Sequence, residues 1–167
     1  TMPFLLEEME PYPIIIKLVS GTQGMGVILA ENKSNAESIL EAFYATREKV
    51  IMQKFIREAK GADIRAFVVD GEIVGAMKRQ AKPGDFRSNL HRGGTSELIT
   101  LTSQEEETAL KSVEILGLKI AGVDMLKTNS GPVVLEVNAS PGLEGIEGTT
   151  GVDIAGKIIS FIEKNRK

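Results

Sequence analysis

Residues 123–138, VDMLKTNSGPVVLEVN, decide how the sequence is interpreted, because two apolar runs flank a turn signal there. The turn signal is Asn-Ser-Gly at 129–131, and a three-residue loop with glycine is a common connection between hairpin strands. Each run also carries an acidic residue among its apolar ones. The stretch therefore predicts a β-hairpin with carboxylates in strands that otherwise have the composition of a core.

The register of this hairpin brings the acidic residues together. A three-residue loop pairs Thr128 with Pro132, and the same register places Asp124 opposite Glu136. Because strand side chains alternate, Asn138 shares their face of the sheet. Like charges placed directly opposite each other are destabilising, so a hard cation between these oxygen donors would explain them. The alternative is an exposed hairpin face whose acids are solvated.

The whole sequence indicates an ordinary globular protein. Its 167 residues suffice for one domain or two small lobes, and 42% of them are hydrophobic and 26% charged. The net charge of −3 gives no reason to expect a general nucleic-acid binder, and without cysteine there is no disulfide or thiolate chemistry. No apolar run approaches the ~20 residues of a membrane span, and the N-terminus lacks a signal pattern. We expect a cytoplasmic protein.

Hairpins dominate the expected elements, which predicts an α+β domain with antiparallel sheets and flanking helices. The expected strands are 14–19, 27–31, 50–56, 63–69, 72–79 and the two strands of 119–138; the expected helices are 34–49, 103–117 and 152–167. Capping boxes at Ser34/Glu37 and Ser103/Glu106 mark two helix starts. We expect an irregular segment at 1–12, with room for one short helical turn, and loops at 80–97 and 139–151. The first of these loops would be functional or disordered because of its length.

Several polar features suit a phosphorylated ligand, although each is weak alone. Lys17 precedes the glycine-rich loop SGTQGMG at 20–26. The backbone N–H groups of such a loop can surround an anion. The loop matches neither the Walker A nor the Rossmann motif. The segment FRSNLHR at 86–92 is a basic cluster that suits phosphate or carboxylate. The alternatives are a flexible hairpin tip and a solvated loop face.

Other polar residues have a purely structural alternative. Asp63 and Arg65 share a strand face, where they could form cross-strand ion pairs and do no more. His91 is the only histidine, so a histidine-based metal site or triad cannot be assembled. Together with the acidic hairpin, the glycine loop and the basic loop supply what phosphoryl transfer needs: donors for phosphates, cations for developing charge and carboxylates for Mg²⁺.

Four segments carry a resemblance to a known family: PIIIKLVSGTQGMGVILAE, MQKFIREAKGADIRAFVVDGEIVGAMKR, FRSNLHRGG and VDMLKTNSGPVVLEVNASPGLEGIE. They resemble the ATP-grasp ligases, and most of all the RimK group, which adds glutamates to the C-terminus of a small-subunit ribosomal protein. The likeness runs from about residue 13 to the end. FRSNLHRGG followed by the D…E-x-N pattern is highly specific to that group.

The resemblance implies roles for individual residues. Those implied to bind ATP are Lys17, Gly21, Thr22, Gln23, Gly24, Lys54, Phe55, Asp63, Arg87, Ser88 and Asn89. Lys17 and the glycine loop would contact the phosphates, the strand at Lys54 and Phe55 would meet adenine through its backbone, and Asp63 would hold the ribose. The catalytic residues would be Arg87 and Asn89. Asp124, Glu136 and Asn138 would bind two Mg²⁺ or Mn²⁺.

The resemblance also implies an ATP-grasp domain over 13–167, with a nucleotide lobe at about 13–60 and a metal lobe at about 61–167. RimK-like enzymes have a further N-terminal domain, so we expect a C-terminal portion of a larger enzyme. The implied partners are ATP, glutamate and the C-terminal peptide of the ribosomal protein. Assembly into a homo-oligomer is plausible, and no direct binding to nucleic acid or to a membrane is expected. Open alternatives are a ligase for another amino acid and a carrier protein, peptide or coenzyme, a non-catalytic nucleotide- and metal-binding fragment, or a cation-stabilised β-rich domain without nucleotide.

Overall fold

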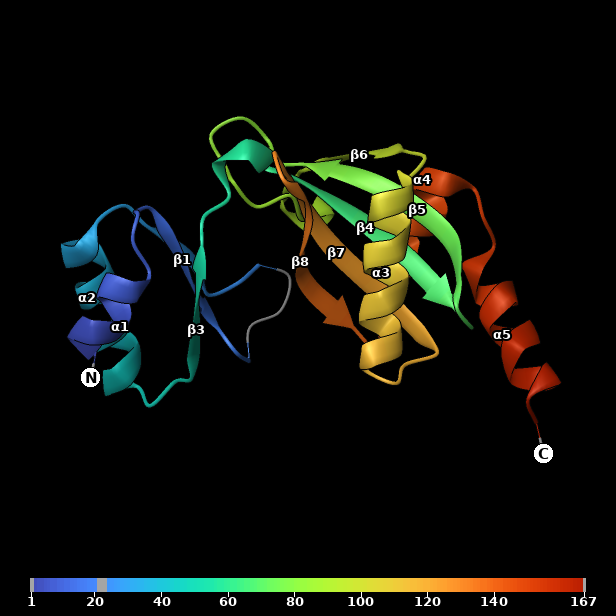
Figure 1. Cartoon of the computed structure of the whole chain (residues 1–167), viewed down its shortest axis with the longest axis horizontal. Coiled ribbons are helices and arrows are strands. Elements are labelled where there is room, and N and C mark those ends of the chain that lie inside the picture. Colours follow the sequence, from blue (N-terminus) through green and yellow to red (C-terminus); the bar gives the residue numbers. More distant parts are fainter. Residues whose placement is uncertain (1, 21–23, 167) are drawn as a thin grey trace. The chain divides into compact units, whose positions relative to one another are not determined.

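The computed structural model describes residues 2–20 and 24–166, and the chain falls into two compact units, Thr1–Ile56 and Arg57–Lys167 (Figure 1). The first unit contains α1 (Met2–Glu8), β1 (Ile14–Leu18), β2 (Val27–Ala30), α2 (Lys33–Ala45) and β3 (Val50–Lys54). Its strands form an antiparallel sheet in the order β2-β1-β3.

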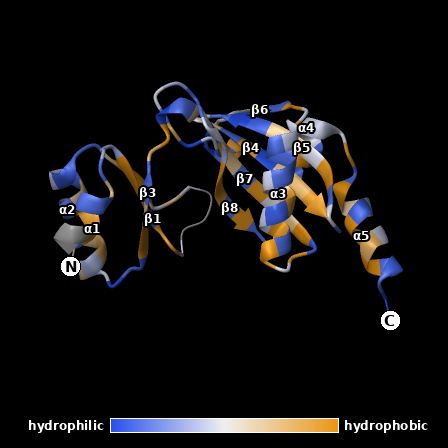
Figure 2. Cartoon of the chain, in the orientation of Figure 1, coloured by the Kyte–Doolittle hydropathy of each residue, from blue (hydrophilic) through white to orange (hydrophobic). Residues whose placement is uncertain are grey.

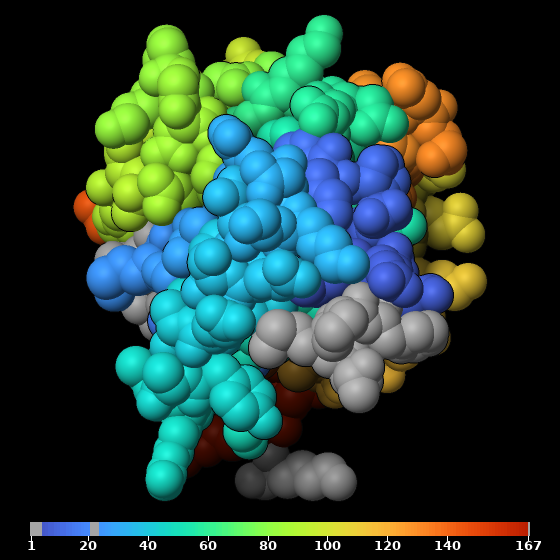
Figure 3. All heavy atoms as spheres, turned by 90° about the vertical axis from the view of Figure 1, so that its left-hand side faces the viewer, coloured from blue at the N-terminus to red at the C-terminus, as the bar shows by residue number. Residues whose placement is uncertain are grey.

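Both helices of the first unit pack on one face of its sheet, where Ile14 and Ile16 are fully buried against Leu6 of α1 and Ala36 of α2. The outer side of α2 is exposed, and its light-blue and cyan atoms face the viewer in Figure 3. In the segment 1–12, where at most one short helical turn is expected, α1 is a helix of seven residues. The helix forms there because Leu6 enters the core.

The α2 helix begins and ends earlier than the sequence pattern predicts. Asn32, not Ser34, caps it, since the Asn32 side chain accepts a 2.9 Å hydrogen bond from the backbone N–H of Asn35. The helix ends at Ala45, and Arg47 just beyond it has a positive φ of 59°. Such a left-handed residue does not continue a helix.

The second unit is a five-stranded antiparallel sheet in the order β6-β5-β4-β7-β8, with helices on both faces (Figure 1). Its strands are β4 (Ala62–Val69), β5 (Glu72–Gln80), β6 (Thr95–Leu98), β7 (Ile120–Thr128) and β8 (Gly131–Asn138). Its helices are α3 (Ser103–Ile115), α4 (Glu144–Thr150) and α5 (Ile154–Lys164), with short 3₁₀ turns η1 (Arg57–Ala59) and η2 (Leu90–Arg92).

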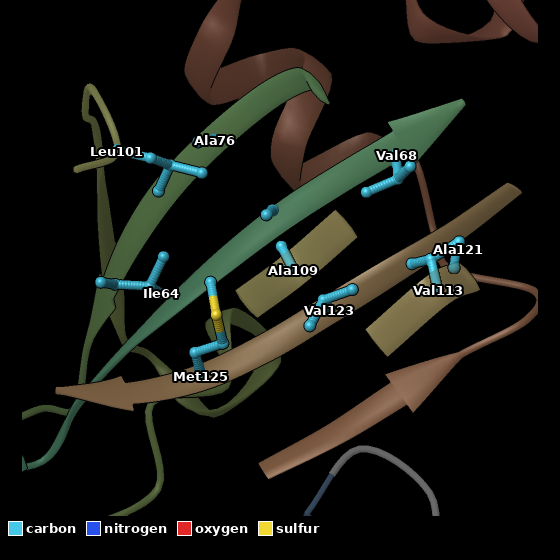
Figure 4. Packing of buried hydrophobic residues seen from close by; sticks show 10 residues of the cluster. Ile64, Val68, Ala76, Leu101, Ala109, Val113, Ala121, Val123 and Met125 are labelled. Atoms are coloured by element: carbon cyan, nitrogen blue, oxygen red, sulfur yellow. The ribbon is translucent and has the colours of Figure 1, made fainter. Parts of the chain in front are cut away.

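One face of this sheet is a continuous apolar core beneath α3. Val68, Val123 and Met125 of the sheet pack against Ala109 and Val113 of the helix (Figure 4). The apolar residues of these strands alternate with residues of the opposite face, as a two-residue period requires. In Figure 2 apolar colouring is seen on β7 and β8, and α3 and α5 carry both apolar and polar colouring.

The opposite face of the sheet is apolar only at one end. There, Phe67 and Met77 are covered by Ile146 of α4 and Ile154 of α5. At the other end, the same face carries polar residues of the central strands, which are described below.

Two elements of the second unit lie where the sequence predicts loops. β6 occupies part of 80–97 because it pairs with the free edge of β5, although it has little apolar alternation of its own. α4 occupies part of 139–151 despite its two glycines, because Ile146 is completely buried. The capping box of α3 is formed by Thr102 and Glu105, one residue earlier than expected.

Candidate functional site

The hairpin of β7 and β8 pairs Asp124 with Glu136, as the sequence predicts, but by a different route. Thr128 pairs with Gly131, so the loop has two residues and not three. A β-bulge at Leu135 adds one residue farther along and restores the predicted register. Gly131, with φ of 117°, adopts a conformation that other residues rarely tolerate, which explains the earlier return of the chain.

Asp124 is held by two arginines in the interior of the sheet. Its side chain is only 3% exposed. Arg65 of β4, its register neighbour, donates from Nε to Oδ1 at 2.6 Å and from Nη2 to Oδ2. Arg79 of β5 donates from Nη2 to the same Oδ2 at 2.9 Å. The carboxylate that the hairpin places in a core position is therefore charge-paired within the protein.

Arg79 also connects this carboxylate to Asp63. Arg79 donates from Nε to Asp63 Oδ1 at 2.7 Å and from Nη2 to Asp63 Oδ2 at 2.6 Å, and the two residues are register neighbours on β5 and β4. The Ser88 hydroxyl donates to Asp63 Oδ2 at 2.7 Å. Asp63, Arg65, Arg79 and Asp124 thus form one ionic network, and both structural ion pairs that the sequence left open are present.

The ionic network is balanced, because two carboxylates face two guanidinium groups. Burial alone would raise the pKa of Asp124, but hydrogen bonds and charge from Arg65 and Arg79 hold it below its ordinary value. Burial alone would lower the pKa of Arg79, but its contacts with Asp63 and Asp124 raise it. The sequence interpretation assigned the charge that offsets Asp124 to a metal; in the structure the arginines supply it.

The three residues proposed to bind metal share one sheet face. Glu136 is exposed, and Asn138 Nδ2 donates to Glu136 Oε1 at 3.1 Å. Three hydrogen bonds occupy three of the four acceptor positions of the Asp124 carboxylate, so one position remains at Oδ1. Among residues 2–20 and 24–166, no group of three His, Cys, Asp or Glu side chains could hold a metal. Two carboxylates and an amide nevertheless fit Mg²⁺, which completes its shell with water and phosphate oxygens.

The basic loop between β5 and β6 is ordered and anchored. Ser88 bonds to the ionic network, and Leu90 packs with the apolar cluster beneath α4. A Cβ on Gly94 would lie 2.8 Å from the Ser88 carbonyl oxygen, so the loop closes on itself tightly. Arg87 and Asn89 are both partly exposed on this loop. The structure therefore joins Ser88 to Asp63, and Arg87 and Asn89 are its neighbours in the loop.

The remaining predicted site residues belong to the first unit. Lys17 lies on β1, on the face that points away from the helices, whereas Lys54 pairs with Ile14 and so lies on the opposite face at the end of β3. Phe55 follows directly and is partly buried. Gly24 has φ of 74° in the turn before β2. Gly21, Thr22 and Gln23 lie outside the described residues.

The sequence interpretation gave no role to two residues that organise the second unit. In the sequence pattern Arg79 is only the last residue of an expected strand, and Asp85 is only a residue of an expected loop. Regular alternation from the pair Val69 and Glu72 would place Asp63 opposite Lys78; a bulge between Phe67 and Val68 moves Arg79 into that position. For Asp85 a local signal existed, since an Asp two residues before a loop residue often bonds to that residue's backbone.

The family of the chain follows from its sequence as a whole. The model of the RimK-like ATP-grasp domain matches residues 4–162. The chain belongs to this family. A probable alpha-L-glutamate ligase 1 of Shewanella amazonensis is 56% identical over 163 residues, and a probable alpha-L-glutamate ligase of Thioalkalivibrio sulfidiphilus is 54% identical over the same length. Both alignments cover 98% of this chain and 54% of the relative, so the chain spans about half of their length.

Solved structures confirm the ATP-grasp fold. A RimK domain ATP-grasp protein from Sphaerobacter thermophilus superposes with a TM-score of 0.69 at 27% identity, over 96% of this chain and 56% of that one. A D-alanine–D-alanine ligase from Bacillus anthracis, complexed with ATP, gives 0.70 at 24% identity, over 95% and 53%. In the described part of the chain, no helix has the length and apolar character to cross a membrane.

Proposed function

We propose that the chain is the ATP-dependent part of a carboxylate–amine ligase that adds glutamate. The observation that carries this proposal is the pairing of Asp124 with Glu136, on the sheet face that also holds Asp63 and Arg79. A buried, charge-balanced network beside an exposed carboxylate and a basic loop is suited to a metal-bound polyphosphate. Family membership and the names of the relatives support the same reaction class.

The residues proposed to bind ATP have distinct roles. Lys17, Gly21, Thr22, Gln23 and Gly24 contact the phosphates in this proposal, and Lys54 and Phe55 meet adenine through the backbone. Asp63 accepts three hydrogen bonds, which leaves one acceptor position at Oδ1 for a ribose hydroxyl. Asp63 is held rigidly by Arg79, so the ribose would meet a carboxylate that is already oriented.

Asp124, Glu136 and Asn138 would hold two Mg²⁺ or Mn²⁺. When bound, these ions would offset the negative charge of the phosphates and of the transferring phosphoryl group. The buried guanidinium groups keep Asp124 ionised and fixed in place. Asn138 fixes Glu136 by the hydrogen bond between their side chains.

The reaction would proceed in two transfers. A substrate carboxylate oxygen attacks the γ-phosphorus of ATP, the bond to the β–γ bridging oxygen breaks, and ADP and an acylphosphate form. The amine of an amino acid then attacks the acyl carbon, loses a proton, and expels inorganic phosphate to leave an amide. Arg87 and Asn89 would stabilise the charge that develops on the phosphoryl and acyl oxygens. No side chain of the protein forms a covalent bond.

Glutamate as the amino acid is supported by the names of the relatives. Three further parts of the proposal rest on the resemblance to RimK enzymes: the C-terminus of a ribosomal protein is the acceptor, the reaction takes place in the cytoplasm, and the enzyme is a homo-oligomer. Incubation with ATP, Mg²⁺, glutamate and a peptide carrying that C-terminus would test it by mass spectrometry, with a mass increase of about 129 Da per added glutamate residue expected from the loss of water on amide formation.

The nucleotide site is tested by calorimetric titration with a non-hydrolysable ATP analogue, with and without Mg²⁺. Asp124→Ala would be a poor test variant, because it leaves Arg65 and Arg79 buried without that partner. Glu136→Gln removes one exposed charge and spares the ionic network. Glu114→Gln, on the exposed side of α3, is the matched control.

We expect Mg²⁺-dependent binding in the wild type and in Glu114→Gln. Binding to Glu136→Gln should be at least about tenfold weaker, which corresponds to a loss of ~1.4 kcal/mol in binding free energy when one metal ligand is weakened. Equal affinity of all three proteins, or binding that ignores Mg²⁺, would contradict the proposed site.

A further inference from the structure

The carboxylate of Asp85 organises the basic loop from its centre. Oδ1 accepts hydrogen bonds from the backbone N–H of Phe86 at 2.8 Å and of Arg87 at 3.0 Å. It also accepts one from Arg87 Nε at 3.0 Å, while Oδ2 accepts from Arg87 Nη2 at 3.1 Å. Arg92 Nε lies 3.9 Å from Oδ2. One side chain therefore fixes the backbone turn, orients the guanidinium of Arg87 and lies near that of Arg92.

The geometry holds Arg87 in a single orientation. Asp85 engages Nε and Nη2 along one edge of the guanidinium, so the hydrogens on Nη1 stay directed away from Asp85. The guanidinium carbon lies 5.4 Å from the centroid of the Phe86 ring, which adds a cation–π contact. Planar, bidentate pairing gives Arg87 more directional control than a single hydrogen bond would.

Arg92 has a different relation to the same carboxylate. Its Nε is buried and makes no hydrogen bond within the described part of the chain. At 3.9 Å the contact with Asp85 is electrostatic, which offsets the cost of burying that end of the guanidinium. Asp85 is thus the counter-charge for two of the cations that give the loop its positive character.

The support beneath this arrangement is rigid. The Ser88 hydroxyl bonds to buried Asp63, and Leu90 packs with the apolar cluster of Phe67 and Ile146. The Asp85 side chain itself is 10% exposed. The hydrogen bonds from the Arg87 side chain are the largest influence that holds the pKa of Asp85 below its usual range, which favours the charged carboxylate.

We propose that Asp85 is a positioning residue of the ligase, which acts through Arg87 by holding its guanidinium in the orientation that receives an anionic oxygen of ATP or of the acyl group. The inference rests on the proposed function and assigns a residue beyond those proposed to touch the substrates. Pre-orientation lowers the entropy that binding must remove from a long side chain.

A competing effect has the opposite sign and makes the inference testable. The Asp85 carboxylate is itself negative and repels a phosphate, so its removal would strengthen anion binding if orientation were unimportant. The two backbone hydrogen bonds favour orientation, because they hold Asp85 in place independently of the Arg87 side chain.

The test is a double-mutant cycle on binding of Mg²⁺ and a non-hydrolysable ATP analogue. The four proteins are the wild type, Asp85→Asn, Arg87→Ala and the double variant, with Asp70→Asn as control. Asp70 lies exposed in the β4–β5 turn, where its positive φ of 50° suits asparagine, and its carboxylate is 3.6 Å from Lys119. A second readout is the Nε–H resonance of Arg87 in a nitrogen-15 spectrum, which a bonded guanidinium retains against exchange.

In the wild-type background, we expect Asp85→Asn to lower the affinity for the ATP analogue about tenfold, as the loss of a charge-assisted hydrogen bond does. In the Arg87→Ala background, the same change should alter the affinity by less than about twofold. Asp70→Asn should match the wild type. Tighter or unchanged binding in Asp85→Asn, or an equal loss in both backgrounds, would overturn the inference.

The two hypotheses fail differently. A wild-type chain that binds no nucleotide would overturn the proposed function. In that case the Nε–H resonance of Arg87 still decides whether Asp85 orients it: the resonance should be present in the wild type and Asp70→Asn and lost in Asp85→Asn. Its persistence in Asp85→Asn would overturn the inference on its own.

Discussion

The two ends of one sheet face in the second unit use the same strands in opposite ways. Beneath α4 and α5, Phe67 and Met77 are buried among apolar side chains. Farther along the same face, Asp63 and Arg65 of β4 and Arg79 of β5 take the place of these apolar residues. Asp124 of β7 completes the ionic network. The apolar end is stabilised by volume and contact, and the ionic end by charge balance. The comparison predicts how each end responds to substitution.

The largest loss of stability should follow Arg79→Leu. The change leaves Asp63 and Asp124 buried with less compensating charge, and removal of one partner from a buried pair typically costs about 3–5 kcal/mol. Urea unfolding of the variant and the wild type measures the difference in the free energy of unfolding. A loss below about 1 kcal/mol would mean that water or local movement replaces the ion pairs.

A double variant sharpens this result. Asp63→Leu with Arg79→Leu removes charge from both sides, so its loss should be smaller than that of Arg79→Leu alone, because a buried pair replaced by apolar groups is often close to neutral. A loss equal to the sum of the two single changes would contradict the ionic network as the cause.

At the apolar end, Met77→Ala should cost about 2–3 kcal/mol, through lost contact and a cavity beneath α4. Met77 is 1% exposed, so little of the lost volume is open to solvent. The free energy of unfolding of this variant should depend on pH and salt no more strongly than that of the wild type. A strong salt dependence would show that the two ends are not separate in their energetics.

Acid should expose the contribution of Asp85. Because its folded pKa is depressed by Arg87, its stabilisation is fully present above the unfolded pKa of about 3.9 and is lost as pH falls through the lower folded pKa. Asp85→Asn should therefore be less stable than the wild type at pH 7, by about 1–2 kcal/mol for its charged hydrogen bonds, and the difference should shrink below about pH 4. Thermal unfolding at several pH values measures it, and a difference that persists unchanged at pH 2 would contradict this assignment.

The smallest effect should come from Glu136→Ala without metal. Glu136 is exposed and lies opposite Asp124, so its removal relieves some repulsion. The free energy of unfolding should change by less than about 0.5 kcal/mol, in either direction. Urea unfolding in the presence of a chelator tests it. An unfolded or strongly destabilised variant would make Glu136 a structural residue.

The hairpin shows how far local sequence patterns reach. The pairing of Asp124 with Glu136 is confirmed, but the predicted loop was one residue too long and the bulge at Leu135 was not foreseen, so two differences cancel. The strands predicted at 63–69 and 72–79 are present as β4 and β5, yet the bulge after Phe67 gives Asp63 a partner that regular alternation does not predict. Bulges depend on packing against neighbouring strands, and a single strand's alternation does not reveal them.

The same limit applies to α4 and to the basic loop. The glycines of α4 indicate a loop, and only the burial of Ile146 against the sheet explains a helix there. The basic character of the loop could be read from its sequence. Its order could not, because it depends on Asp63 and on the apolar cluster around Leu90, which are distant in the sequence.

The central claim is that the sheet face of Asp124, Glu136 and Asn138 binds the metal of a nucleotide complex. The most direct measurement is paramagnetic broadening in a nitrogen-15-labelled chain on addition of Mn²⁺ with a non-hydrolysable ATP analogue. We predict that amide resonances at positions 124, 136 and 138 broaden first, and that Glu136→Gln weakens this effect. Broadening centred instead on the acidic start of α3, at Glu105 to Glu107, would contradict it.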